Sequence, residues 1–510
     1  MDKTVIDSGK IVRKAFCLFK MFIPLFSDLR LRIYRELSDI WLSPFQDAEE
    51  AFMLVHIELG FLYDVLYTKA AILQSIVGRI LRSICYLSTF VALVAFSIAV
   101  DKSGYPGEDI LITYVLLGGA ILLDILSATS IAFSSWAILW LTSPRRLLSK
   151  CAYQRIVSWL VHRKLKKRGT VSVAQHSLIG YCLKVKTSKW TAILRMLDTE
   201  EIFQKFLGTS WEQVNGDLKK FIYKHLQEKF KQYQNLKDKI DDKQVFNHDK
   251  LLSILRERGD RALQNYEIDE EYFERSIHDV EFSHSVLAWH IATFILFYDD
   301  HKTYSGSVLG SYCQISKLLS EYMMYLLQVW PLMLPKGIGL VRIKDTREEV
   351  VRYFGKRSSS MSNNDAASAL LPTGNEFLLF STRGKSVLQD GRKLASMLKA
   401  LVTESRWDLE KKWEVIANVW MEMLTFAAGR CGWREHNIHL KSGSELLTHV
   451  ALLMAHLGLT EHIRIVTASA DDLLLESTAN QVQPSSEMPP IGQTLMWDWD
   501  QLSHLAYYMA

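Results

Sequence analysis

The chain contains a run of 18 residues without any charge, SICYLSTFVALVAFSIAV, from Ser83 to Val100. A helix of this length extends roughly 27 Å at 1.5 Å per residue, which is close to the hydrocarbon thickness of a bilayer. The run is apolar on every side, whereas helices that pack on a protein core are usually amphipathic. The pattern therefore predicts a membrane span, and a buried core helix is the alternative.

A second apolar run, ILITYVLLGGAILLDILSATSIAFSSWAILWL, covers Ile110 to Leu141, with Asp124 as its only charge. One span needs about 20 residues, so this run favours a single long or tilted helix, with Trp136 and Trp140 toward a membrane interface. An acid within a span costs roughly 2.5–3.5 kcal/mol on insertion scales. Asp124 is therefore a candidate intramembrane functional group, unless the overlong helix slides it toward the headgroups.

The charges beside the two runs predict the orientation of this hairpin. Arg79 and Arg82 precede the first run, and the segment between the runs, Asp101–Asp109, carries one lysine and three acids. Positive charge near a span stays in the cytoplasm, so we expect both chain ends to be cytosolic. Basic residues after the second run are candidates for contact with anionic lipid headgroups, or they lie on an ordinary solvated helix. They are Arg145, Arg146, Lys150, Arg163, Lys164, Lys166, Lys167 and Arg168.

Helical periodicity without strand-like alternation dominates the rest of the chain, so we predict an all-α protein. Two apolar stretches, HSVLAWHIATFILFY and EYMMYLLQVWPLML, are too short for spans and are predicted to be core helices of a cytosolic region. The expected parts are an amphipathic helical segment at 1–79, a transmembrane hairpin at 80–141 (spans about 83–100 and 110–141), a basic juxtamembrane segment and helical domain at 142–355, a polar linker at 356–384, a C-terminal helical domain at 385–465 and a disordered tail at 466–510.

Histidines gather in the C-terminal helical block, among His436, His439, Glu445, His449, His456 and His462. Glu445, His449 and His456 are spaced so that they could share one helix face, and together with His436 they are candidate ligands of zinc or iron. A packed or hydrogen-bonded histidine on this apolar helix is the simpler interpretation. Ser442 and Glu445 also form an S-x-x-E capping box, and Gly458 is a predicted helix stop.

Composition narrows the function classes. The net charge of +4 over 510 residues gives no case for a nucleic-acid-binding protein. The six cysteines are far apart and form no CxxC pair, which argues against a disulfide scaffold or a zinc module. No phosphate loop, dinucleotide fingerprint, nucleophile elbow or zincin motif is present. Basic residues near glycines in Pro331–Glu349 could meet a phosphate, but a solvated surface loop is the simpler interpretation.

Several long motifs resemble a known family. FQDAEEAFMLVHIELGFLYDVLYTKA, VEFSHSVLAWHIATFILFY and LSEYMMYLLQVWPLMLPKGIGLVRIKDTREE resemble the plant membrane-protein family called domain of unknown function 4220. NVWMEMLTFAAGRCGWREHNIHLKSGSELLTHVALLMAHLGL resembles its C-terminal companion, domain of unknown function 594. The resemblance covers most of residues 45–465 and implies a plant integral membrane protein with a cytosolic helical region. It implies no reaction and no catalytic residues.

Members of this family usually have further hydrophobic helices before the first motif, whereas about 45 residues precede it here, so we expect a shortened N-terminal part. Three functions follow as hypotheses. The first is a non-enzymatic membrane-anchored scaffold or regulatory adaptor that contacts lipids and other proteins, needs no cofactor and binds no nucleic acid. The second is a subunit of a channel or transporter centred on Asp124. The third is a metal-dependent enzyme that uses the histidine cluster.

Overall fold

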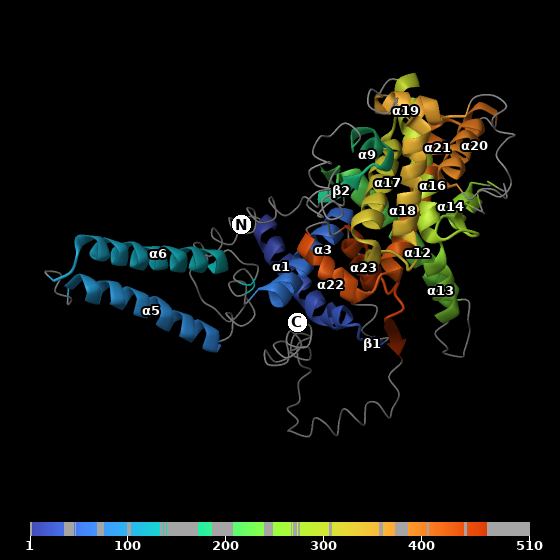
Figure 1. The fold of residues 1–510 in the computed structure, drawn as a ribbon. Helices are drawn as coiled ribbons and strands as arrows, with labels where there is room; N and C mark the ends of the chain where they lie inside the picture. The colour runs from blue at the N-terminus through green and yellow to red at the C-terminus, as the bar shows by residue number, and fades with distance from the viewer. Residues whose placement is uncertain are drawn as a thin grey trace. The chain divides into compact units, whose positions relative to one another are not determined.

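A computed structural model shows a protein built almost entirely of helices (Figure 1). It describes residues 3–34, 45, 47–68, 76–98, 104–132, 136, 139, 172–185, 208–238, 248–266, 268, 273, 276–304, 309–355, 361–372, 386–404, 407–442 and 446–466. Within these residues the strands form two short pairs. β1 (Leu31–Tyr34) runs parallel to β4 (Ile463–Val466), and β2 (Ser172–His176) runs antiparallel to β3 (Thr209–Gln213). The all-α prediction is confirmed.

The chain divides into two compact units. Unit 1 comprises residues 1–27, 52–169 and 469–510, and unit 2 comprises residues 28–51 and 170–468. The helices of unit 1 are α1 (Lys3–Phe22), the 3-10 turn η1 (Ile23–Ser27), most of α3 (Ala48–Tyr67), α5 (Ile76–Ile98) and α6 (Gly107–Ala132). The predicted N-terminal segment 1–79 is thus shared between the two units.

Helices α5 and α6 lie side by side as a hairpin within unit 1 (Figure 1). Polar groups join them: Arg82 donates hydrogen bonds to the hydroxyls of Tyr86 on α5 and Ser127 on α6. Nearer the connecting loop, the rings of Phe96 and Tyr114 meet edge to face at 5.2 Å between centroids. The hairpin prediction is confirmed, and both helices begin before the predicted spans, at Ile76 and Gly107.

Trp136 lies in an aromatic cluster of unit 1. Its ring centroid is 5.0 Å from that of Phe61 and 5.6 Å from that of Phe16, and Phe19 completes the group. Its side chain is buried because these three aromatic rings cover it, whereas the sequence predicts it toward a membrane interface. Trp140 lies outside the described residues.

The core of unit 2 is built on two buried helices, α16 (Phe282–Thr303) and α17 (Ser311–Val329). Nearly every residue of α16 from Phe282 to Phe297 is buried, because helices cover it on several sides. α20 (Val387–Glu404) packs on α16, and α21 (Leu409–Arg430) packs on α17 (Figure 1). The prediction that the two apolar stretches are core helices is confirmed.

The predicted domains at 142–355 and 385–465, on either side of the predicted linker at 356–384, both contribute helices to unit 2. Helices from both predicted domains share one core within unit 2, because each leaves an apolar face that the other covers. The predicted linker also contains a helix, α19 (Asn363–Leu370). The Ser362 hydroxyl accepts the Asp365 N–H while the Asp365 carboxylate accepts the Ser362 N–H, which is a capping box.

The remaining described helices of unit 2 are α9 (Leu178–Val185), α12 (Gly216–Asp238), α13 (His248–Arg256), α14 (Asp260–Asn265), η2 (Pro331–Met333), α18 (Gly339–Phe354), α22 (Trp433–His439), η5 (Leu440–Ser442) and α23 (Leu446–His456). The helix stop at Gly458 is confirmed: its φ is 69°, and the Leu459 N–H returns to the Met454 carbonyl at 2.8 Å. Ser442 lies in η5, and its predicted capping partner Glu445 lies outside the described residues.

Candidate functional site

A polar cavity of about 370 Å³ lies in unit 2 between α12, α14, α17 and α21. Its residues recur with helical spacing, so each helix turns one face to it. From α12 come Phe221, Lys224, His225, Glu228 and Lys229, and from α21 come Glu414, Asn418 and Glu422, spaced four apart. The segment before and within α14 supplies Glu257, Arg261, Ala262, Asn265 and Tyr266, and α17 supplies Tyr312.

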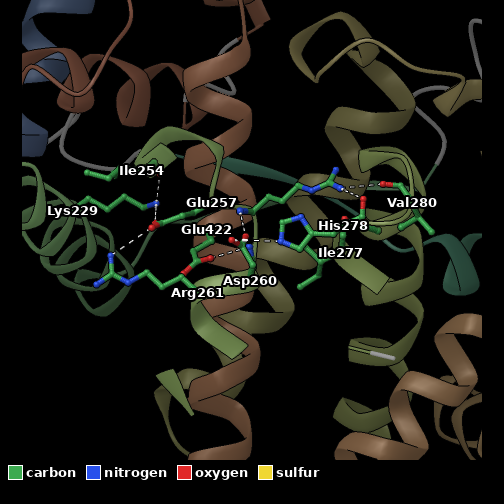
Figure 2. Close-up of polar contacts among 12 residues, drawn as sticks. Lys229, Ile254, Glu257, Asp260, Arg261, Ile277, His278, Val280 and Glu422 are labelled. Carbon is green, nitrogen blue, oxygen red and sulfur yellow. Dashed lines mark hydrogen bonds and ion pairs between the residues drawn. The ribbon is translucent and has the colours of Figure 1, made fainter. Parts of the chain in front are cut away.

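Two cations at the cavity, Lys229 and Arg261, share one carboxylate, that of Glu257, as Figure 2 shows. The Lys229 ammonium lies 2.7 Å from one oxygen of Glu257, and it also donates to the Ile254 carbonyl at 3.2 Å. The Arg261 guanidinium approaches the other oxygen of Glu257 at 3.7 Å. Because the Lys229 side chain is only 3% exposed, this pairing is needed to offset the loss of its hydration.

Glu422 occupies the buried end of the cavity. One of its oxygens accepts the backbone N–H of Gly259 at 2.8 Å, at the start of α14 (Figure 2). Gly259 has φ of 130°, and a Cβ there would lie 2.7 Å from a methyl of Ile277, so only glycine fits. Burial raises the pKa of Glu422 to about 7, although Lys229 opposes this effect. A carboxyl group that ionises near neutrality in a cavity marks a candidate functional residue.

The segment that presents Gly259 is fixed by its neighbours. The Arg258 N–H donates to the Asp260 carboxylate at 2.8 Å, and the Arg258 guanidinium donates to the carbonyls of His278 at 2.8 Å and Val280 at 3.2 Å (Figure 2). The imidazole Nε2 of His278 lies 3.6 Å from the second oxygen of Asp260. These contacts hold the Gly259 N–H toward Glu422 before any ligand arrives.

Two tyrosines, Tyr266 and Tyr312, and the imidazole of His225 also line the cavity. Burial raises the pKa of Tyr266 and of Tyr312, and hydrogen bonds to Glu414 add to the effect. His225 is nine-tenths buried, and burial beside Lys229 keeps its pKa well below the usual value, so the imidazole is neutral. Among the residues that the structure describes, His225 Nε2 has no hydrogen-bond partner.

A buried Ser320–His290 pair elsewhere in unit 2 resembles a catalytic dyad in composition. The two side chains are 2.8 Å apart, through Nδ1 of the imidazole. However, the Leu178 N–H donates to Nε2 of His290 at 3.2 Å, so Nδ1 carries the ring proton and donates to the serine. Burial also lowers the pKa of His290 to about 3. This imidazole cannot take the serine proton and is better understood as a structural link.

The predicted metal ligands do not form a cluster in the described part of the chain. No three His, Cys, Asp or Glu side chains there come together as ligands, and Glu445 lies outside it. Nδ1 of His436 lies 3.1 Å from the Thr448 hydroxyl, and burial lowers the pKa of His436 to about 3. His449 is fully buried, and the His456 ring packs 5.6 Å from that of Phe45. These three histidines therefore lie buried in the core of unit 2.

The other predicted sites have mixed outcomes. Asp124 is half-buried on the face of α6 that also carries Ser127, the residue bonded to Arg82 of α5. All eight predicted lipid-headgroup residues, from Arg145 to Arg168, lie outside the described residues. The predicted surface loop at 331–349 is largely helical, as η2 and the first part of α18, and its Arg342 pairs with Glu281 at 3.0 Å.

Sequence reasoning missed the cavity. Its clearest signal is the spacing of Glu414, Asn418 and Glu422, three polar residues four apart in the stretch 413–424, which is otherwise apolar. The partners of Glu422, Gly259 and Lys229, lie more than 160 residues earlier in a strongly charged region. Nothing local in that region distinguishes the buried Lys229 from its solvated neighbours.

Comparison with known proteins identifies two matched regions. Residues 2–181 match the family described as Domain of unknown function (DUF4220). Residues 405–459 match the family described as Protein of unknown function, DUF594. The order of the two regions is the one that the sequence motifs indicate. No curated protein and no solved structure matches the chain.

Proposed function

We propose, from the premise that the chain carries a DUF4220 region followed by a DUF594 region, that it is a non-enzymatic membrane-anchored scaffold or regulatory adaptor. In this proposal α5 and α6 cross the membrane, and unit 2 recruits partners in the cytosol. One observation carries the anchoring part of the proposal. α5 and α6 are long and apolar enough to span a bilayer, and no residue of either apolar window is buried in the protein.

The exposed side chains of the hairpin favour a lipid environment. They include Leu87, Phe90, Val91, Leu116, Leu122 and Leu123, each more than half exposed. Contact with water costs about 25 cal/mol for each Å² of apolar surface, so a row of such residues on both helices would be strongly unfavourable in solution. Contact with lipid tails in place of water removes that cost. The backbone N–H and C=O groups need no water either, because they are paired within each helix.

The orientation follows from the charges beside the apolar runs. Arg79 and Arg82 lie in the first turns of α5, and further basic residues follow α6 in the sequence. The stretch Asp101–Asp109 between the apolar runs carries one lysine and three acids, which supports cytosolic placement of both chain ends. Unit 2 then faces the cytosol, where a large helical surface is available to proteins. The polar groups between α5 and α6, Arg82 with Tyr86 and Ser127, would be satisfied within the hairpin rather than left in lipid.

Membrane extraction tests the anchor. We expect the intact chain to remain in the pellet after carbonate washing, with tags at both ends open to protease. L87R/V91R should release the chain, because each arginine at a span centre costs roughly 2.5–3.5 kcal/mol on insertion scales. The matched control is L340R/V341R, which changes two exposed apolar residues of α18 in unit 2. Release of the unmodified chain by carbonate, or protection of one tag, would contradict the proposed topology.

Affinity purification tests the adaptor role separately. The full chain, solubilised in mild detergent and captured through a C-terminal tag, should bring down at least one protein in roughly stoichiometric amount. L87R/V91R should retain a partner that binds unit 2 if it is extracted in folded form. An unrelated membrane hairpin of similar abundance serves as the comparison bait. Repeated recovery of the chain alone from its native membranes would rule out a stable scaffold.

A further inference from the structure

We propose that the cavity between α12, α14, α17 and α21 binds a small organic cation through a primary ammonium group, held by Glu422 and Glu414. The inference goes beyond the proposed anchor and adaptor role, because that role needs no small ligand. It rests on three features of the cavity: carboxylates that form no direct ion pair, an acceptor set that matches an ammonium group, and aromatic walls.

The charges of the cavity leave two carboxylates without a direct ion pair, although the more distant Lys229 lowers the pKa of one of them, Glu422. Lys229 and Arg261 both pair with Glu257, and Lys224 faces Glu228 at 4.0 Å near the surface. Within the described parts of the chain, neither Glu414 nor Glu422 has a cationic nitrogen within 4.0 Å. Two carboxylates that line one cavity without such partners favour a bound cation over a bound anion.

The hydrogen-bond acceptors match an ammonium group, which has three N–H donors and no acceptor. The Glu422 carboxylate is one acceptor. The neutral imidazole of His225, in the tautomer that carries its proton on Nδ1, offers another at Nε2, which is buried and has no partner among the described residues. Asn418 uses its NH₂ group to donate to the Glu414 carbonyl at 2.9 Å and to the Tyr266 hydroxyl at 3.4 Å, so its side-chain oxygen remains as a third acceptor.

Aromatic rings supply the walls for the rest of the ligand. Phe221 and Tyr312 meet edge to face at 5.6 Å between centroids, and Tyr266 lies on the same cavity. Such rings attract cations through their faces and pack well against methylene groups. The volume of about 370 Å³ is at the lower end of the range for small-molecule sites. The geometry therefore fits an alkyl or aryl amine, and the described residues offer no cluster of three metal ligands.

Proton linkage gives the site a distinctive signature. Glu422 is faced by His225 and Lys229 from α12 and by Glu257, Asp260 and Arg261 from the segment that leads into α14, while Glu414 lies two turns away on its own helix. Because the pKa of Glu422 is raised to about 7, a cation must displace a proton from it below neutrality. Affinity should therefore rise by several-fold between pH 6 and pH 8.

Calorimetric titration of the detergent-solubilised full chain tests the proposal. The probes are 1,4-diaminobutane and benzylammonium, with benzoate as the anionic comparison, at pH 8. We expect saturable 1:1 binding of an ammonium probe and none of benzoate. E422Q should weaken that binding at least tenfold, because the amide keeps the acceptor for Gly259 but removes the charge. E348Q, which changes an exposed glutamate of α18, should leave it unchanged.

A second variant protects the test against misfolding. Glu414 is only half-buried, so E414Q should fold even if E422Q does not, and it should also weaken binding severalfold. No binding of either ammonium probe to the folded chain would overturn the proposal. Binding that survives both E422Q and E414Q would place the cation elsewhere and would overturn it equally. Carbonate extraction of the same variants is expected to be normal, so failure here is separable from failure of the membrane anchor.

Discussion

Lys412→Met is expected to lower the free energy of unfolding by about 3–5 kcal/mol. The Lys412 ammonium lies 2.7 Å from the Asp300 carboxylate, and both side chains are almost completely buried, at 2% and 6% exposure. The Trp413 indole N–H donates to the same carboxylate oxygen at 2.8 Å. Methionine preserves the aliphatic stem but leaves the Asp300 charge buried with one neutral donor. The loss of a partner is costlier than the pair itself is favourable, because the remaining ion cannot be rehydrated.

The neighbouring acid provides a matched control. Asp299 pairs with Lys399 at 2.6 Å, but the lysine side chain is 40% exposed. Lys399→Met should therefore cost less than about 1 kcal/mol, since both ions can return to water. Urea unfolding of the full chain, followed by tryptophan fluorescence, compares the two variants, and Trp413 itself reports on the buried pair. Equal midpoints for K412M and K399M would show that the Asp300 pair is not buried as described.

The long helices could be predicted from the sequence because their signals are local. An uncharged run such as 83–100 is sufficient to predict a helix long and apolar enough to cross a membrane, and a shorter one such as 284–298 predicts a core helix. Which of the two acids, Asp299 or Asp300, forms the buried ion pair could not be predicted in this way. Both follow the same apolar stretch, and only the packing of α16 against α21 determines which acid meets Lys412.

The predicted linker at 356–384 contains a local helix-start signal, but its polar composition favours the prediction of a loop. Ser362 and Asp365 have the spacing of a capping box, which begins α19, but they stand within the polar stretch SSSMSNNDAAS. The apolar residues Ala366, Ala367 and Leu370 bury this short helix against α16. Its stability therefore comes from tertiary packing, which a reading of polarity along the chain does not reveal.

The predicted histidine site and the observed cavity differ because a site depends on packing between distant segments, which spacing along the chain does not show. Histidine spacing suggested a metal centre, yet a neutral histidine such as His436 can be buried cheaply once the Thr448 hydroxyl binds its ring. The cavity instead depends on residues that are distant in sequence. Glu422 is unusual only because the Gly259 N–H and the Lys229 charge meet it inside the protein. Such a site emerges from the fold rather than from a motif.

Glu422→Gln is expected to stabilise the protein at pH 8 and to flatten part of its dependence on pH. The pKa of Glu422 is about 7 in the folded protein against an ordinary value of 4.5, so the folded state holds more protons than the unfolded state between these values. The stabilisation by the protonated carboxyl is complete below pH 4.5 and is lost as the pH rises through 7. The difference between the folded and ordinary pKa values of Glu422 corresponds to about 3 kcal/mol of unfolding free energy. Glutamine retains an acceptor for Gly259 and never ionises.

Unfolding free energies at pH 5, 6, 7 and 8 test this expectation when the variant is compared with the unmodified chain. Buried histidines such as His436 contribute with the opposite sign, because a lowered folded pKa makes stability rise with pH between the folded value and 6.5. Those contributions are common to both proteins and cancel in the difference. The advantage of E422Q over the unmodified chain should therefore grow from pH 5 to pH 8, whereas E348Q should show no such trend. A difference independent of pH would mean that Glu422 is hydrated and ionises normally, and the cavity would then lack its buried acid.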